Sequence, residues 1–118
     1  MLLVLAIPRM GDLMTDATIA RVFVEPGARF ERGDPLFEMR IDLGAVAAQN
    51  CVPISYARVV AHEAGWLRRL DGEAGAVLGV GATLAIASTS PDEALEARAT
   101  RPLRINVGVV PTLGRRGA

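Results

Sequence analysis

The chain has 118 residues, of which 51% are hydrophobic, and this length and apolar content fit one globular domain with its own core. Thirteen basic residues balance thirteen acidic ones, so no single-sign field favours a nucleic-acid backbone or an anionic membrane as partner. Every basic residue is arginine, which excludes chemistry that needs a side-chain amine, including Schiff bases, lipoylation and biotinylation.

The first residues, MLLVLAI, lack a basic leader and reach Pro8 too soon to span a bilayer. They predict a first strand over 2–7 and a cytoplasmic location. The single cysteine, Cys51, cannot form an intramolecular disulfide and suits a reducing compartment.

Short strands follow, separated by Gly and Pro turns. They are predicted at 18–24, 35–43, 56–62, 66–70 and 83–87, with extended links at 28–32 and 77–80. The clearest is 35–43, in which apolar and charged residues alternate, so that Glu38, Arg40 and Asp42 are expected to form a solvated charge row. This pattern predicts an all-β barrel or sandwich.

An internal repeat links the two halves of the chain. The segment 25–36 matches 73–84 at five positions, with a spacing of 48 residues and glycine turns at equivalent places. The repeat predicts two similar half-domains related by approximate twofold symmetry.

The C-terminal segment has a different pattern. Ser90-Pro91-Asp92-Glu93 has the residues of a helix N-terminus and predicts a short helix that ends before Pro102. The alternation over 103–109 predicts a strand, which could join a sheet edge of its own subunit or of a neighbour. The last residues, 114–118, are expected to be disordered. We therefore divide the chain into a domain at 1–89 and a C-terminal extension at 90–118.

Several motifs carry a family resemblance: Ile7-Pro8 with Gly11 and Met14, Asp16-Ala-Thr-Ile19, Glu25-Pro-Gly27, Gly33-Asp34-Pro-Leu36, Glu38, Asp42, Gly65-x-Leu67, Glu73-x-Gly75 and Gly81-x-x-Leu84-Ala-Ile86. Over roughly residues 3 to 88 the chain resembles the lipoyl/biotinyl carrier domain. The best-matching subgroup is the lipoyl domain of the acyltransferase component of 2-oxo acid dehydrogenase complexes. The resemblance implies a barrel-sandwich hybrid, a flattened β-barrel of two quasi-symmetric antiparallel sheets.

The chain departs from this family at the hairpin tip. Aligned on Gly33-Asp34 and Asp42, Leu43 occupies the position of the lysine that carries lipoate or biotin, so no cofactor is expected. The loop 44–55 is about a dozen residues longer than the family needs, and His62 stands where the family usually has proline. An aliphatic Leu43 is expected to be a core or rim hydrophobe.

Other candidate residues each have two interpretations. Cys51 could be a reactive thiolate with His62 as base, or a small packed hydrophobe beside a structural histidine. With a single histidine in the chain, no metal site is expected. Trp66 is expected in the core, the alternative being a partner surface. The apolar loop residues either fold over the sheet or form a contact patch: Val46, Val52, Pro53 and Ile54.

Three functions remain open at this stage. The first is a degenerate lipoyl-like module without catalytic activity of its own, which docks or assembles with protein components of an acyl-transfer complex. The second is a thiol-dependent acyl carrier or enzyme that uses Cys51. The third is a structural homo-oligomer built through the strand at 103–109.

Overall fold

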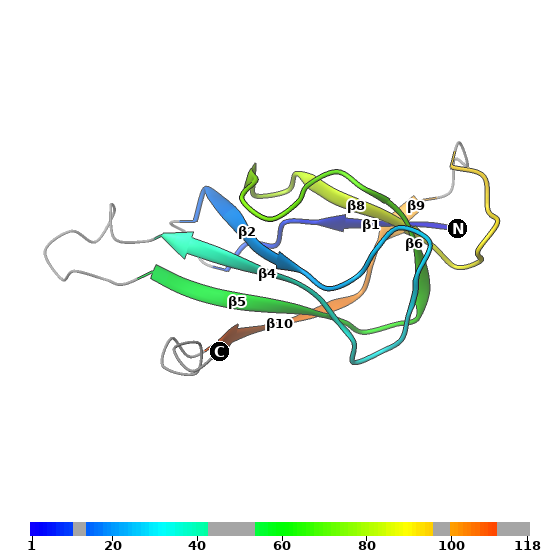
Figure 1. Cartoon of the computed structure of the whole chain (residues 1–118), viewed down its shortest axis with the longest axis horizontal. Helices are drawn as coiled ribbons and strands as arrows, with labels where there is room; N and C mark the ends of the chain where they lie inside the picture. Colours follow the sequence, from blue (N-terminus) through cyan, green and yellow to red (C-terminus); the bar gives the residue numbers. More distant parts are fainter. Residues whose placement is uncertain (11–13, 43–53, 96–99, 111–118) are drawn as a thin grey trace, which may run out of the picture.

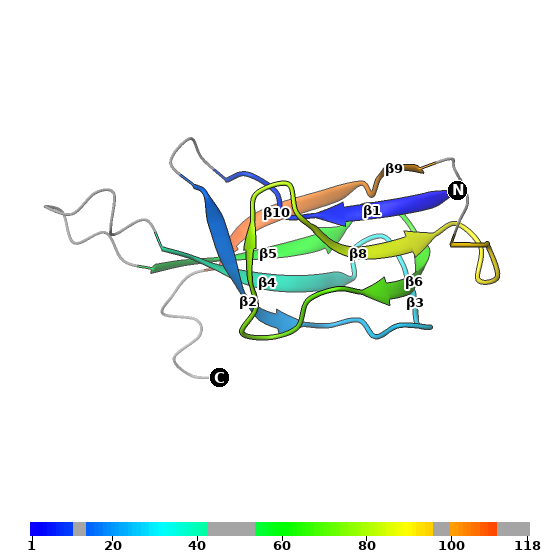
Figure 2. The same cartoon turned by 90° about the horizontal axis from the view of Figure 1, so that it is seen from above.

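The structure, a computed structural model, describes residues 1–10, 14–42, 54–95 and 100–110, and within these ranges the chain forms ten strands and no helix. The strands build two five-stranded sheets that face one another (Figures 1 and 2). In spatial order the first sheet contains β3 (Arg29–Phe30), β6 (Gly65–Leu70), β8 (Thr83–Ser88), β1 (Leu2–Ala6) and β9 (Thr100–Pro102). The second contains β10 (Ile105–Val110), β5 (Ile54–Ala61), β4 (Pro35–Asp42), β2 (Asp16–Val22) and β7 (Val77–Gly79).

The predicted all-β class is confirmed, and each predicted strand lies within a few residues of an observed one. Both extended links became short edge strands, β3 and β7. The strand predicted from Tyr56 begins two residues earlier, at Ile54, because it continues its antiparallel pairing with β4 as far as Asp42. Hydrogen bonding does not join the two sheets into a closed barrel among these strands.

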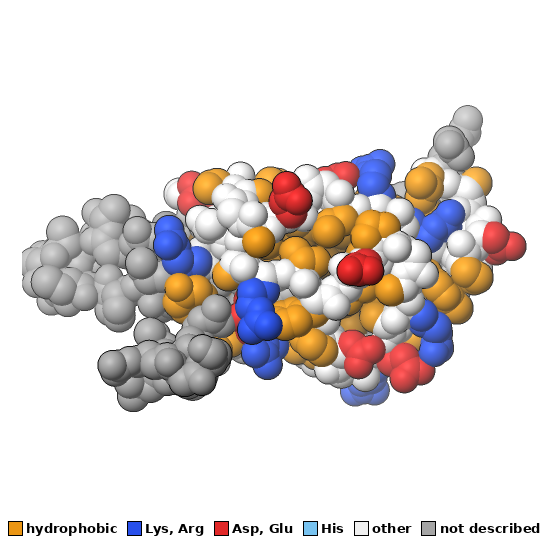
Figure 3. Space-filling view, viewed as in Figure 1, with side chains coloured by type: hydrophobic (Ala, Val, Ile, Leu, Met, Phe, Trp, Pro, Cys, Tyr) orange, Lys and Arg blue, Asp and Glu red, His pale blue; other side chains and the backbone are white. Residues whose placement is uncertain are grey.

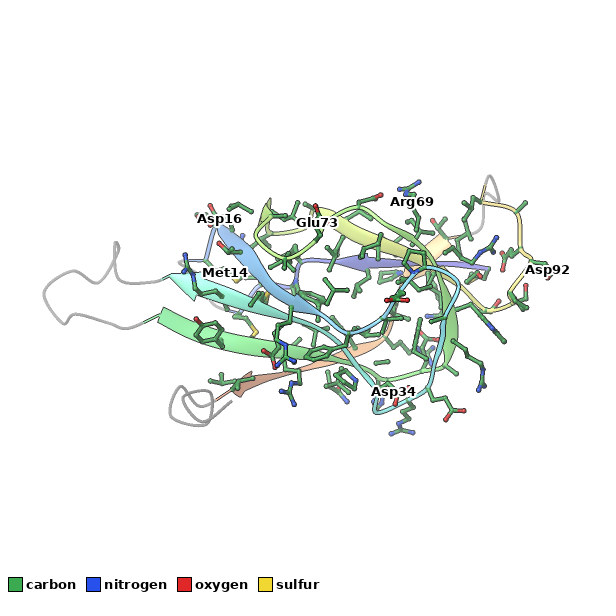
Figure 4. The ribbon with its side chains drawn as sticks, in the orientation of Figure 1. Met14, Asp16, Asp34, Arg69, Glu73 and Asp92 are labelled. Atoms are coloured by element: carbon green, nitrogen blue, oxygen red, sulfur yellow. The ribbon has the colours of Figure 1, made fainter. Side chains whose placement is uncertain are left out.

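The core lies between the sheets and is supplied by alternate residues of nearly every strand. Its largest side chains, each less than 2% exposed, are Leu3, Ile7, Met14, Ile19, Phe30, Phe37, Met39, Val59 and Leu84. Met14 is labelled in Figure 4, where it lies beside β2. Burial of these groups provides the main driving force for folding.

The backbone hydrogen bonds between the sheets repeat with an offset of 48 residues. The Gly27 N–H donates to the Leu67 carbonyl at 2.7 Å, and the Gly75 N–H donates to the Ile19 carbonyl at the same distance. Each donor and each acceptor therefore has its counterpart 48 residues away. The turns that follow show the same relation, since Gly33 and Gly81, like Gly27 and Gly75, have φ between 88° and 97°. The predicted twofold repeat is confirmed by this pattern.

The irregularities of the sheets obey the same symmetry. The pairing of β2 with β4 shifts between Ile19 and Arg21, and the pairing of β6 with β8 shifts between Leu67 and Arg69. A β-bulge at such a place lets two consecutive residues turn toward the same side. The two halves thus share their bulges as well as their turns, as expected of a duplicated unit.

The C-terminal extension contributes one edge strand to each sheet. β9 pairs in parallel with β1, and β10 pairs antiparallel with β5. The strand predicted over 103–109 is therefore formed, within its own chain. Between β9 and β10, Leu103 is buried and its N–H donates to the Val4 carbonyl at 2.9 Å. The disorder predicted for 114–118 lies outside the described residues.

The predicted helix after Ser90 is wrong, since the described residues of this segment form turns. Two carbonyls that a helix would use internally are bound by side chains instead. The Ser88 hydroxyl donates to the Ser90 carbonyl at 2.5 Å, and the Arg68 guanidinium donates to the Glu93 carbonyl at 2.6 Å. These contacts replace the i to i+4 ladder on which an α-helix depends.

Candidate functional site

The predicted hairpin site falls almost entirely outside the described residues. This applies to Leu43, Val46, Cys51, Val52 and Pro53, and also to the side chain of Ile54, whose backbone begins β5 opposite Asp42. The reactivity of Cys51 and the contact role of the loop therefore stay predictions.

His62 follows β5 at the end remote from the 43–53 segment. Its backbone N–H donates to the Arg104 carbonyl at 2.9 Å, and its Nδ1 lies 2.9 Å from Nδ2 of Asn106 in β10. Because an amide nitrogen only donates, this contact requires Nδ1 to accept. These bonds give His62 a structural role in attaching the C-terminal strand. Whether it acts as a base for Cys51 is not tested.

Trp66 does not lie in the core, contrary to expectation. It is half-buried on β6, and the Arg29 guanidinium lies 5.3 Å from its ring. The residues on either side of it, Gly65 and Leu67, take the inward positions. A Cβ on Gly65 would come within 2.9 Å of the Phe30 ring, so the inward position there is already filled.

The predicted charge row on β4 is wrong at Glu38, which is completely buried although it lies on the outer face of the second sheet. Arg58, directly opposite on β5, covers it: Nε and Nη2 lie 2.8 and 2.6 Å from Glu38 Oε2. Arg40 is exposed as expected, and the side chain of Asp42 lies outside the described set. The outer face therefore carries a packed ion pair rather than three solvated charges.

Phe23 extends this cluster, which we call the outer-face cluster: Arg21, Phe23, Glu38 and Arg58. The guanidinium carbons of Arg21 and Arg58 lie 5.1 and 5.6 Å from the Phe23 ring centroid. Such cation–π contacts fix two otherwise flexible side chains on the surface. With two guanidinium groups and one carboxylate, the cluster has an excess of one positive charge.

A shallow groove of about 300 Å³ adjoins the cluster between β5 and β10. It is lined by Arg58, Val60, Gly108, Val109 and Val110. A Cβ built on Gly108 would meet no atom within 4 Å, so this glycine leaves an open notch beside Arg58. The groove thus joins an apolar wall to a half-exposed guanidinium, since the Arg58 side chain is 45% exposed.

A second open groove, of about 460 Å³, lies at the other end of the cluster and includes Phe23, Arg29 and Asp34 in its wall. Figure 4 shows Asp34 in the turn that leads into β4. Its carboxylate is occupied locally, because Oδ2 accepts the Glu31 N–H at 2.9 Å. This groove therefore offers little polar chemistry to a ligand.

The described residues contain no group of three or more metal-ligating side chains. All buried side-chain nitrogen and oxygen atoms in those same ranges have hydrogen-bond partners, so no unpaired polar group marks a ligand site there. Nor does this part of the chain contain a helix long and apolar enough to cross a membrane. The visible surface in Figure 3 mixes apolar side chains with charges of both signs. This arrangement suits contacts with another protein better than covalent or metal-assisted catalysis.

No protein-family model matches the chain, and comparisons with curated proteins and with solved structures find no match. Its function must be inferred from its own residues.

The residues of the outer-face cluster and its groove escaped the sequence analysis. Alternation over 56–62 could have placed Arg58 on the outer face, between Ala57 and Val59. Its pairing with Glu38 depends on the register between β4 and β5. Gly108 carried no signal, since a glycine in a strand pattern does not show what lies above it.

Proposed function

We propose that this chain is a degenerate lipoyl-like module that carries neither lipoate nor biotin and acts as a protein-interaction or assembly element related to 2-oxo acid dehydrogenase complexes. The observation that carries the proposal is the twofold set of hydrogen bonds from Gly27 and Gly75. It supports a scaffold of two quasi-symmetric sheets of the kind that the resemblance implies, a flattened barrel-sandwich hybrid.

The residue at the tip supports the loss of carrier function. Strands β4 and β5 form the hairpin on which the resembling family places its lysine, and the connecting segment 43–53 contains no lysine. Arginine cannot replace it, because a guanidinium stays protonated and is a poor nucleophile. A carrier scaffold without an attachment point retains only its surfaces for function.

We assign partner contact to the outer face of the second sheet. There the groove beside Gly108 places an apolar wall next to Arg58, and Arg21 and Phe23 continue the surface. Arginine and aromatic side chains are enriched at protein interfaces, and prefixed side chains lose little entropy on binding. The excess positive charge favours a partner segment that combines acidic and apolar side chains.

Co-expression with lipoate and biotin ligases, followed by intact-mass measurement, tests the carrier assignment. The wild-type chain is expected to keep its unmodified mass, and an added lipoyl or biotinyl group would refute the proposal. The matched variant is Leu43→Lys, which restores the attachment residue. Its modification would support the lipoyl-like scaffold, whereas an unmodified Leu43→Lys would argue against that likeness at the tip.

Binding to purified components of a 2-oxo acid dehydrogenase complex tests the interaction role. Gly108→Val fills the notch on a strand where no atom opposes the new side chain, so the fold is expected to persist. We expect this variant to weaken binding about tenfold. Wild-type protein that binds none of the components would refute the link to such complexes. Binding that Gly108→Val leaves unchanged would refute this face.

The thiol-dependent alternative depends on Cys51 alone, and no described contact favours it. Labelling by an acyl donor that Cys51→Ala abolishes would establish it in place of the interaction module.

A further inference from the structure

The four edges of the two sheets differ in how well they are protected from pairing with another chain. Edge strands β3, β7 and β9 have two, three and three residues, and β9 contains Pro102. Short edges and edge prolines are common devices against strand addition. β10 is different, because it is an edge strand of six residues.

The composition of β10 also leaves it unprotected. Its sequence, INVGVV, contains no charged residue and no proline. Val109 is 68% exposed, a large fraction for a valine in a sheet. Natural sheets place lysine, proline or a bulge on long edges, and an uncharged apolar edge without them favours strand pairing.

The backbone of β10 points alternate groups away from β5. His62 N donates to the Arg104 carbonyl, while Ala61 N donates to Asp34 on the β4 side. In an antiparallel ladder this alternation assigns Asn106, Gly108 and Val110 to β5. The N–H and C=O groups of Ile105, Val107 and Val109 then face the open edge. Within the described ranges, β5 is the only strand that pairs with β10.

We propose that a second copy of this chain adds to this edge, with the two β10 strands antiparallel about a twofold axis at Val107. In this register Val107 faces its own counterpart, and Ile105 faces Val109 of the other copy. The outward groups of both strands would form about six hydrogen bonds. Two five-stranded sheets would become one continuous sheet.

Side chains of β10 fit this register without conflict. Exposed Val109 would be covered by Ile105 of the other copy, and Asn106 would lie opposite Gly108, whose Cβ position is open. Arg104 would face Val110 of the other copy, so no like charges are opposed. The chain's zero net charge removes long-range repulsion between copies. This self-complementarity favours a second copy over an unrelated strand, and the inference does not rest on the proposed function.

Sedimentation equilibrium of the full chain, from low micromolar to millimolar concentration, tests the proposal. We expect a mass that approaches twice the 12.5 kDa of one chain. Val109→Lys should raise the dissociation constant about tenfold or more, because a charge would be buried against Ile105 of the other copy. The matched control is Val77→Lys on β7, since Val77 is 63% exposed at the opposite edge of the same sheet. It should leave the mass unchanged.

Amide hydrogen exchange identifies the surface independently of mass. In the dimer, the Ile105, Val107 and Val109 amides should become protected as concentration rises, while the amides bonded to β5 stay protected throughout. A monomer at all concentrations would overturn the proposal. So would a dimer that Val109→Lys leaves intact, or one that forms while these three amides remain fast.

Discussion

Glu63 and Arg101 form a bidentate ion pair across 38 residues of sequence. The Arg101 guanidinium donates to Oε2 at 2.7 Å and to Oε1 at 2.5 Å, and the Arg104 backbone N–H donates to Oε2 at 2.8 Å. Glu63 lies in the connection between β5 and β6, whereas its donors belong to the C-terminal extension. One carboxylate therefore holds the point at which the extension passes from the first sheet to the second.

Removing this carboxylate should loosen the extension. Glu63 is only 16% exposed, so Glu63→Ala leaves the two donors without their acceptor and is expected to cost about 2 kcal/mol in the free energy of unfolding. Urea unfolding measures the effect. The matched control is Glu31→Ala, which removes an exposed pair with Arg29 and should cost less than about 1 kcal/mol. Equal costs would contradict the anchoring role.

The same carboxylate predicts a pH dependence. The hydrogen bond from Arg101 holds the pKa of Glu63 below its ordinary value of 4.5. A lowered acid pKa adds stability that is present above the unfolded-state pKa and is lost as the pH falls through the folded-state pKa. We expect wild-type stability to fall below about pH 4.5, and Glu63→Gln to flatten that part of the profile. Parallel profiles for the two proteins would show that other acids dominate.

The buried pair on the outer face predicts non-additive mutations. Arg58→Leu removes the guanidinium that covers buried Glu38 and should cost about 3 kcal/mol. Adding Glu38→Leu to it should recover most of this loss, because two cross-strand leucines no longer bury a charge. A double-mutant cycle by chemical denaturation gives the coupling. Strictly additive costs would mean that the ion pair is incidental to packing there.

The twofold turns predict equal costs at equivalent glycines. Gly27 and Gly75 have φ of 92° and 96°, and a Cβ on either would meet no atom within 4 Å. Alanine at each position should therefore cost only the backbone strain, about 1 to 2 kcal/mol, and nearly the same amount at both. Thermal unfolding provides the comparison. Clearly unequal values would show that the two halves are not energetically equivalent.

Gly65 provides a contrast that depends on space rather than on φ. A Cβ there would lie 2.9 Å from the Phe30 ring and 3.1 Å from the Ser88 carbonyl oxygen. Gly65→Ala is expected to cost about 3 kcal/mol through overpacking, more than either turn substitution. A smaller cost than at Gly27 would show that Phe30 moves aside freely.

Strand positions, turns and the repeat were readable from the sequence because each depends on nearby residues. Alternation marks the buried face of β4, and a glycine such as Gly33 marks a turn that needs positive φ. The helix predicted at Ser90 failed because capping residues state a local preference. Contacts from Arg68 and Ser88, remote or outside that helix, used the same carbonyls.

The sequence by itself determined that this chain is an all-β protein with a duplicated unit and without a lysine to carry a cofactor, since composition and spacing do not depend on the fold. Only the tertiary structure decided that Glu38 is buried under Arg58, that Trp66 lies outside the core and that β10 is a long unprotected edge. Each of these depends on which strand lies beside which and in what register. That register is set by side chains far apart in the chain packing together, and no local pattern records it.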